Sequence, residues 1–130
     1  MPDDDAAIRS LIGRAAHLGD EGDPDDYRSI YTADATWVMG SAEQHGIEEI
    51  VSATAQRRRE GVSGPGTATR HFVTPLHVDV AGDTATAHSY FLFLGDTTGT
   101  PVIRLFGTYT DRLLRTADGW RIQHRTAQVG

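Results

Sequence analysis

The feature that constrains the fold most is a run of long strand patterns in the second half of the chain. Strand composition is predicted over residues 69–80, 84–94, 102–114 and 120–129. The connections between them are Ala81-Gly82-Asp83, the segment 95–101 and Thr116-Ala117-Asp118-Gly119. Short connections of this kind join antiparallel neighbours, so three in succession predict an antiparallel meander.

The first half of the chain is helical by pattern. Residues 5–18 place apolar side chains at helical spacing, behind aspartates that suit a helix N-terminus. Asp23 and Pro24 start a short second helix that we expect to run through Tyr31, and residues 47–60 form a third, ended by Gly61.

A strand over residues 36–39 and a loop or short hairpin over 40–46 separate the second helix from the third. The sequence therefore predicts an α+β fold with three N-terminal helices packed on an antiparallel sheet. At 130 residues, we expect one domain spanning 1–130.

Composition narrows the classes of function. The net charge of −6 disfavours nucleic acid as a partner, and we interpret the basic cluster Arg57, Arg58 and Arg59 as a solvated helix end. No apolar run is long enough to span a membrane, and the acidic N-terminus does not resemble an export signal, so we expect a cytoplasmic protein. The absence of cysteine excludes disulfides and thiolate chemistry.

Both faces of the second long strand are apolar. One face carries His88, Tyr90, Leu92 and Leu94, and the other carries Ala87, Phe91 and Phe93. Because helices can cover only one face of the sheet, we expect a second copy of the chain to cover the outer face, giving a homo-oligomer such as a dimer or trimer.

Several motifs in order resemble one family. They are Tyr31-Thr32-Ala33-Asp34-Ala35-Thr36-Trp37, Thr69-Arg70-His71-Phe72-Val73, Val78-Asp79-Val80-Ala81-Gly82-Asp83-Thr84-Ala85, Tyr109-Thr110-Asp111-Arg112-Leu113 and Asp118-Gly119-Trp120-Arg121-Ile122. Their order resembles the SnoaL-like group of the nuclear-transport-factor-2-like superfamily, which includes scytalone dehydratase, bile-acid dehydratases and polyketide cyclases. The resemblance implies a strongly curved sheet around a conical cavity (a cystatin-like cone) and acid–base chemistry without a metal or organic cofactor.

His71 is the first candidate for that chemistry. An imidazole exchanges protons near neutral pH, and His71 alternates with Phe72 along a predicted strand. The resemblance places His71 at the catalytic histidine of the dehydratases and Asp20 at the aspartate that orients it. The residues alone leave two alternatives open: His71 as a core histidine bonded to a backbone carbonyl, and Asp20 as a polar residue or cap at a helix end.

Departures from the family pattern affect the expected pocket. Gly19 and Met39 occupy positions where the fungal dehydratase has tyrosines, and Leu94 lies near the position of its second histidine. These replacements argue against scytalone dehydratase activity and predict a roomier, more apolar pocket. The base aspartate of the ketosteroid isomerases, also expected near Met39, is missing.

Asp111 is the third catalytic candidate. The resemblance places it near a protonated aspartic acid that stabilises an oxyanion in the isomerases, because an apolar environment favours the neutral acid. The alternative is a structural one, in which Asp111 pairs across strands with Arg104 or Arg112.

The remaining expectations concern the ligand. The residues expected to bind substrate are Gly19, Trp37, Met39, His88, Tyr90, Leu92, Arg104, Tyr109 and His124. No histidine spacing is typical of a metal site, so we expect neither metal nor cofactor. The predicted function is a cofactor-independent dehydratase, isomerase or cyclase that acts on a small, fairly apolar carbonyl or hydroxylated compound. A non-catalytic ligand-binding or scaffold domain is the alternative, and a weaker one is an epoxide hydrolase with an Asp–Arg–Asp site.

Overall fold

Three helices precede the long strands, as predicted. The computed structural model describes residues 3–130 and contains α1 (Asp4–Glu21), the 3-10 helix η1 (Pro24–Ser29) and α2 (Ile47–Arg59). The carboxylates of Asp3 and Asp23 accept hydrogen bonds from backbone N–H groups in the first turns of α1 and η1. Aspartate caps therefore set where both helices begin.

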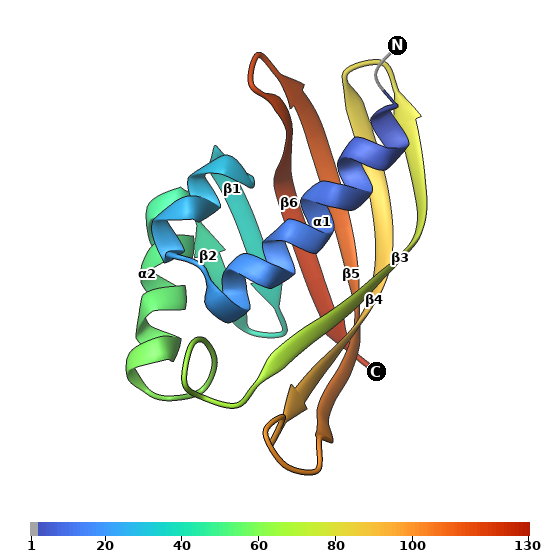
Figure 1. Ribbon diagram of the computed structural model, residues 1–130. Helices are drawn as coiled ribbons and strands as arrows, with labels where there is room; N and C mark the ends of the chain where they lie inside the picture. The colour runs from blue at the N-terminus through green and yellow to red at the C-terminus, as the bar shows by residue number, and fades with distance from the viewer. Residues whose placement is uncertain (1–2) are drawn as a thin grey trace.

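The sheet has six strands, and one pairing differs from the prediction. The strands are β1 (Tyr31–Met39), β2 (Ala42–His45), β3 (Arg70–Ala81), β4 (Thr84–Gly95), β5 (Val102–Thr116) and β6 (Gly119–Val129), in the order β2-β1-β6-β5-β4-β3. The meander from β3 to β6 is confirmed, but β1 pairs with β6 in parallel. After α2 the chain enters the sheet at its far edge and winds back, so β6 reaches β1 in the same direction (Figure 1).

The second predicted helix is shorter than expected, and the strand after it is longer. η1 ends at Ser29, and β1 begins at Tyr31 because that residue already pairs with Ile122 of β6. Of the loop and the short hairpin predicted for residues 40–46, the hairpin is present, because β2 pairs with β1. The turn between the two strands includes Gly40, whose φ is +59°.

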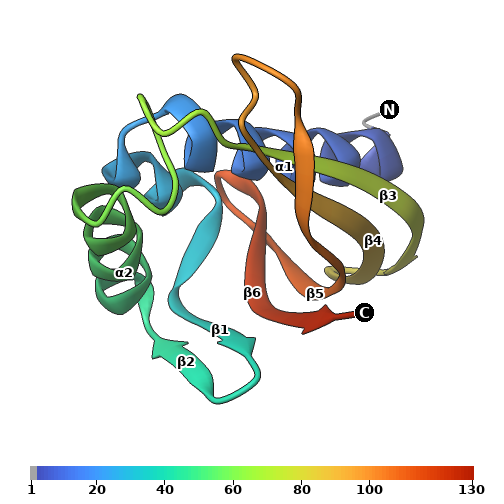
Figure 2. The same ribbon diagram turned by 90° about the horizontal axis from the view of Figure 1, so that it is seen from below.

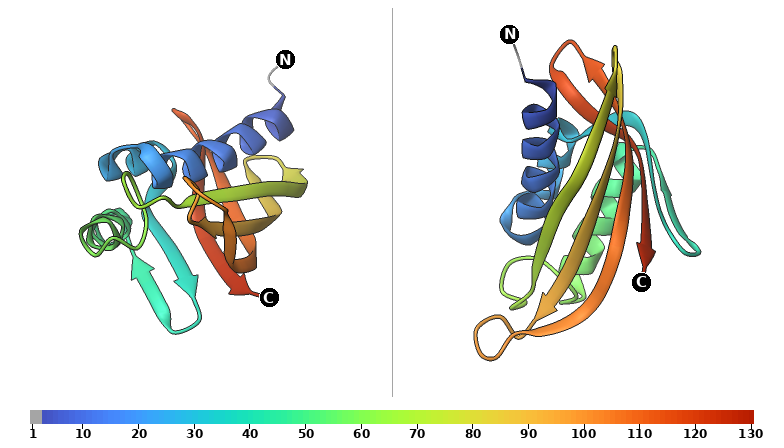
Figure 3. Two further views of the ribbon diagram at one scale, coloured as in Figure 1. Left: turned by 60° about the horizontal axis from the view of Figure 1, so that its bottom comes forward. Right: turned by 90° about the vertical axis from the view of Figure 1, so that its right-hand side faces the viewer.

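The sheet is bent, and its two faces differ. One extra residue interrupts the pairing in each of β3, β5 and β6, and bulges of this kind increase twist and bending. Figures 2 and 3 show the long strands curling, with α1 across the concave inner face and α2 beside β1. The α+β class and the curved sheet are therefore as predicted.

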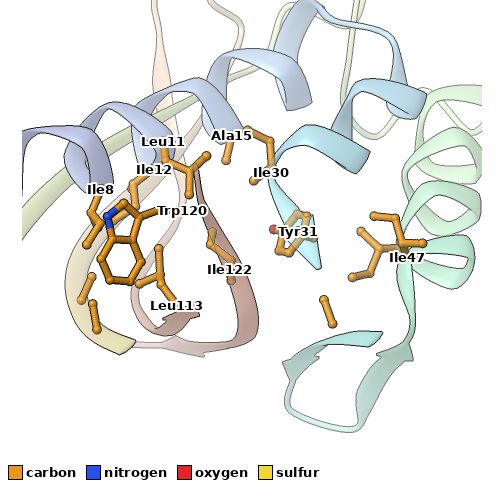
Figure 4. Packing of buried hydrophobic residues seen from close by; sticks show 14 residues of the cluster. Ile8, Leu11, Ile12, Ala15, Ile30, Tyr31, Ile47, Leu113, Trp120 and Ile122 are labelled. Carbon is orange, nitrogen blue, oxygen red and sulfur yellow. The ribbon is translucent and has the colours of Figure 1, made fainter. Parts of the chain in front are cut away.

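The apolar stripe of α1 packs on the inner face of the sheet. Ile8, Leu11 and Ile12 are buried against Leu113 and Ile122 (Figure 4). Burying each such side chain stabilises the fold by about 1.5–3 kcal/mol. This contact confirms the helical stripe predicted for residues 5–18.

The outer face of the sheet is left bare by the helices. Phe72, Tyr90 and Phe106 are exposed there on adjacent strands, and the rings of Tyr90 and Phe106 lie 5.4 Å apart between centroids. The second copy expected to cover this face stays a prediction. No helix within residues 3–130 is both long enough and apolar enough to cross a membrane.

Two glycines should respond to substitution in opposite ways. A Cβ on Gly107 would lie 2.5 Å from the ring of Phe91, whereas a Cβ on Gly13, in the exposed part of α1, has no neighbour within 4 Å. Gly107→Ala should therefore destabilise the fold by about 1–3 kcal/mol. Gly13→Ala should stabilise it by about 0.5–1 kcal/mol. Urea unfolding of both variants measures the difference, and equal effects would contradict the close approach at Gly107.

Asp4 joins the start of α1 to the hairpin of β5 and β6. Its carboxylate accepts two hydrogen bonds of 2.8 Å from Arg115 and one of 3.1 Å from the indole of Trp120, and together these lower the pKa of Asp4 to about 2. The stabilisation is therefore present above the ordinary aspartate pKa and is lost as the pH falls through about 2. Asp4→Asn should melt below the wild type at pH 7, and the gap should narrow as the pH falls toward 2. A gap that does not change with pH would contradict this account.

Candidate functional site

A cavity of about 360 Å³ lies between the helices and the inner face of the sheet. Trp37, Phe91, Phe93 and Tyr109 line it from the strands, and Gly19 lines it from α1. Phe91 and Tyr109 stack with ring centroids 4.3 Å apart. This is the size and lining of a small-molecule site.

His71 and Asp20 meet at the wall of this cavity. Nδ1 of His71 lies 2.8 Å from Oδ1 of Asp20, and the imidazole ring lines the cavity beside Phe93 at 4.8 Å between ring centroids. The structure therefore brings together the two residues that the sequence suggested as a pair. Their catalytic role stays a prediction.

Asp20 also holds the backbone of β3. Both of its oxygens accept hydrogen bonds from the main-chain N–H of His71, at 3.1 and 3.0 Å. An ionised carboxylate can only accept hydrogen bonds, so an Asp20 carboxylate pairs with the form of His71 that carries a proton on Nδ1. No group within residues 3–130 forms a hydrogen bond with Nε2 of His71, so this ring nitrogen has no partner in the described part of the chain.

Arg58 fixes the end of α1 from which Asp20 projects. Its guanidinium donates hydrogen bonds to the carbonyls of Leu18 (2.8 Å), Gly19 (3.3 Å) and Gly22. A cation at a helix C-terminus is favourable because the last carbonyls have no partner in the helix. The interpretation of Arg58 as part of a solvated helix end is therefore wrong, because its side chain reaches across to α1.

The space at Gly19 is used by a tyrosine from the next helix. A Cβ on Gly19 would lie 2.7 Å from the hydroxyl of Tyr27, which donates a hydrogen bond of 3.4 Å to the Ala15 carbonyl. The sequence predicted a more apolar cavity at this point. Instead Tyr27 places a phenol where Gly19 leaves room.

Three phenols belong to the cavity wall. Burial raises the pKa of Tyr27 and Tyr31 above the ordinary value and that of Tyr109 to about 12. All three therefore remain neutral hydroxyl groups at physiological pH and can donate hydrogen bonds. Tyr109 was predicted to line the pocket. Tyr27 and Tyr31 were assigned only to a short helix, so their place in the cavity wall was missed.

Asp111 does not serve as a free acid in the cavity. Its two oxygens accept hydrogen bonds of 2.7 and 3.0 Å from Arg125, and both side chains are buried. Burial alone would lower the pKa of Arg125, but the Asp111 carboxylate raises it well above the ordinary value. The structural alternative for Asp111 is therefore correct, although its partner is Arg125 and not Arg104 or Arg112.

Arg125 was missed because of a bulge in β6. Ile122 pairs with Leu113 and His124 pairs with Arg112, so one extra residue of β6 lies between these pairs. The bulge reverses the alternation of side chains, bringing Arg125 to the inner face, 3.9 Å from the ring of Tyr109. His124, expected in the pocket, instead contacts the hydroxyls of Thr36 and Thr126 and does not line the cavity.

Four further residues that were expected to bind substrate do not line the cavity. His88, Tyr90 and Leu92 alternate with cavity-lining Phe91 and belong to the outer face. Apolar composition could not distinguish the two faces of this strand. Arg104 is exposed, with its guanidinium 3.6 Å from Asp96, and it does not approach Asp111. The Asp–Arg–Asp site that an epoxide hydrolase would need is therefore not formed by these residues.

The remaining predictions for the cavity are met in part. Gly19, Trp37, Met39 and Tyr109 all line it. Within residues 3–130, no group of three or more His, Asp or Glu side chains is arranged to hold a metal ion. The substrate-binding role of these lining residues stays a prediction.

Arg57 also belongs to the cavity wall, so its interpretation as part of a solvated helix end is wrong. It lines the cavity from α2, half-buried, with its guanidinium carbon 5.9 Å from the ring centroid of Trp37. Helical spacing could have revealed this position. Thr54 follows Ile50 by four residues and Arg57 follows Thr54 by three, so Arg57 continues the buried face of α2.

Solved structures with similar folds cover nearly the whole chain. An NTF2-like protein with a cystatin-like fold from Novosphingobium aromaticivorans is 26% identical, with a TM-score of 0.81 over 95% of this chain and 80% of that one. A candidate dehydratase of the NTF2-like family from Streptomyces avermitilis is 20% identical, with a TM-score of 0.77 over 96% and 95%. A cystatin-like protein from Nostoc punctiforme is 17% identical, with a TM-score of 0.83 over 96% and 90%.

These similarities agree with the curved sheet and the helices that close its inner face. A sequence comparison with curated proteins finds no match. The sequence profile of the SnoaL-like domain, however, matches residues 2–126, which is nearly the full length of the chain. This chain therefore belongs to the SnoaL-like domain family, with the NTF2-like, cystatin-like fold.

Proposed function

We propose that this chain is a cofactor-independent acid–base enzyme that dehydrates, isomerises or cyclises a small, fairly apolar carbonyl or hydroxylated compound. The observation that carries the proposal is the 2.8 Å contact of His71 Nδ1 with Asp20 at the wall of an apolar cavity. The likeness to the Streptomyces avermitilis candidate dehydratase is consistent with it.

His71 would act as both base and acid. Its Nε2 takes a proton from the carbon next to a substrate carbonyl. The electron pair of that C–H bond forms a carbon–carbon double bond, and the π pair of the carbonyl moves to the oxygen, giving an enolate. The imidazolium then returns the proton to another carbon in an isomerisation, or to a departing hydroxyl group, which leaves as water in a dehydration. Asp20 stabilises the transient imidazolium and keeps the ring oriented.

The cavity supplies the other requirements of this chemistry. The hydroxyls of Tyr27, Tyr31 and Tyr109 stay neutral, as their raised pKa values require, and a neutral phenol can donate a hydrogen bond to a developing enolate oxygen. The stacked rings of Phe91 and Tyr109 form a flat apolar wall for the body of the substrate.

Replacing the proposed base should abolish proton transfer. The probe is 2-tetralone, a bicyclic ketone whose α-protons exchange with D₂O. ¹H NMR follows the rate of this exchange, and the rate in buffer alone is subtracted. His71→Asn keeps a donor for Asp20 but has no base, so we expect the catalysed exchange to fall by about 10²- to 10⁴-fold. Circular dichroism confirms that the variant is folded.

The chain contains a matched control for this experiment. His77 lies on the same strand and faces Asp79 at 3.4 Å, but its side chain is exposed and does not line the cavity. His77→Asn should exchange protons at the wild-type rate. Full activity of His71→Asn contradicts the mechanism, and a ketone that binds without catalysed exchange supports the ligand-binding alternative.

Asp20 should act through the orientation and tautomer of His71. Asp20→Asn removes the charge that holds the proton on Nδ1, so we expect exchange to fall by about 10²-fold or more. The ¹⁵N NMR signals of the His71 ring should shift from the Nδ1–H tautomer toward Nε2–H. A variant that loses activity without this spectral change would show that Asp20 only supports the fold.

A further inference from the structure

Arg57 is a cation at the cavity without an anionic partner. Within residues 3–130 no carboxylate forms an ion pair with it, whereas Arg125, the other arginine of the cavity wall, is neutralised by Asp111. Removing a guanidinium from water without an opposite charge is costly. A bound molecule that fills the cavity would displace water from Arg57. It would then need to offer the guanidinium hydrogen-bond acceptors in place of that water.

The side chain of Arg57 is held in position on α2. Its Nη2 donates a hydrogen bond of 3.2 Å to Thr54 Oγ1, and the Thr54 hydroxyl donates to the Ile50 carbonyl at 3.1 Å. The guanidinium also lies 5.9 Å from the ring centroid of Trp37, which lines the same cavity. Since a guanidinium has five N–H donors, four remain free after the bond to Thr54.

The surrounding groups favour an anion at this position. Arg57 acts on the phenols of Tyr27, Tyr31 and Tyr109 by lowering each pKa against the larger effect of burial, which shows that its charge reaches all three. Guanidinium and phenol groups are all hydrogen-bond donors, so together they complement an oxygen anion. His71 projects from β3 and Arg57 from α2, so the two groups belong to different walls.

We infer that Arg57 binds an anionic oxygen group of the ligand, a carboxylate or an ionised phenol, and thereby selects acidic aromatic or polycyclic molecules. The inference rests on the proposed function only for the assignment of this cavity as the substrate site. The anionic group docks on the α2 wall, while the apolar body of the molecule lies against Phe91 and Tyr109 and its reacting part faces His71.

Binding of a matched pair of probes tests the inference without any turnover. 2-Naphthoate and 2-naphthamide have the same shape, but only the first is charged at pH 7. Isothermal titration calorimetry of the wild type should show 2-naphthoate binding about tenfold more tightly, which is about 1.4 kcal/mol, because hydrogen bonds to a charged oxygen are stronger than those to a neutral amide. Arg57→Gln should remove this preference, and Arg57→Lys should retain part of it.

Arg59→Gln is the matched control, since Arg59 is an exposed arginine of the same helix end that does not line the cavity. It should keep the wild-type preference. Because the titration measures binding without turnover, its outcome is independent of the proposed proton transfer. Equal affinity of the wild type for the two probes, no binding of 2-naphthoate, or a preference that survives in folded Arg57→Gln would each overturn it.

Discussion

The site depends on one carboxylate that joins a helix end to a strand. Asp20 accepts hydrogen bonds from both the backbone N–H and the ring Nδ1 of His71. This double contact ties the last turn of α1 to the start of β3 and orients the imidazole at the cavity wall. Arg58 stabilises this end of α1 by donating hydrogen bonds to the carbonyls of Leu18 and Gly19. The ends of three elements therefore meet at one buried charge.

The cavity exists because the packing along α1 is uneven. Near its beginning, α1 packs over β3 and β6, and the small residues Ala85 and Ala87 of β4 belong to the same continuous core. Near its end, Gly19 faces the hydroxyl of Tyr27, and the strand residues are the larger Phe91 and Phe93. Large rings on the sheet hold the layers apart there, and the bends in the strands deepen the space.

Charge is distributed unevenly in this interior. The buried pair of Asp111 and Arg125 neutralises itself and, through the contact of Arg125 with Tyr109, fixes the position of a phenol. Arg57 has no such partner within the described part of the chain, so the wall formed by α2 is positive while the rest of the lining is apolar or neutral. An apolar cavity with one imidazole and, within the described residues, one unpaired guanidinium suits a ligand that is largely hydrophobic but carries a single acidic group.

The sequence by itself determined the helices and the meander of long strands, which follow from local periodicity and turn chemistry. Resemblance to the family suggested the pair of His71 and Asp20, and their contact appears only in the tertiary structure. Tertiary structure decided which face of β4 is internal, because both faces are apolar and only the docking of α1 distinguishes them. It also decided the place of Arg125 in the cavity wall, because a single bulge in β6 reverses the alternation of side chains. The contact of Arg58 with the end of α1 depends on what α2 packs against, and no pattern within one helix contains that information.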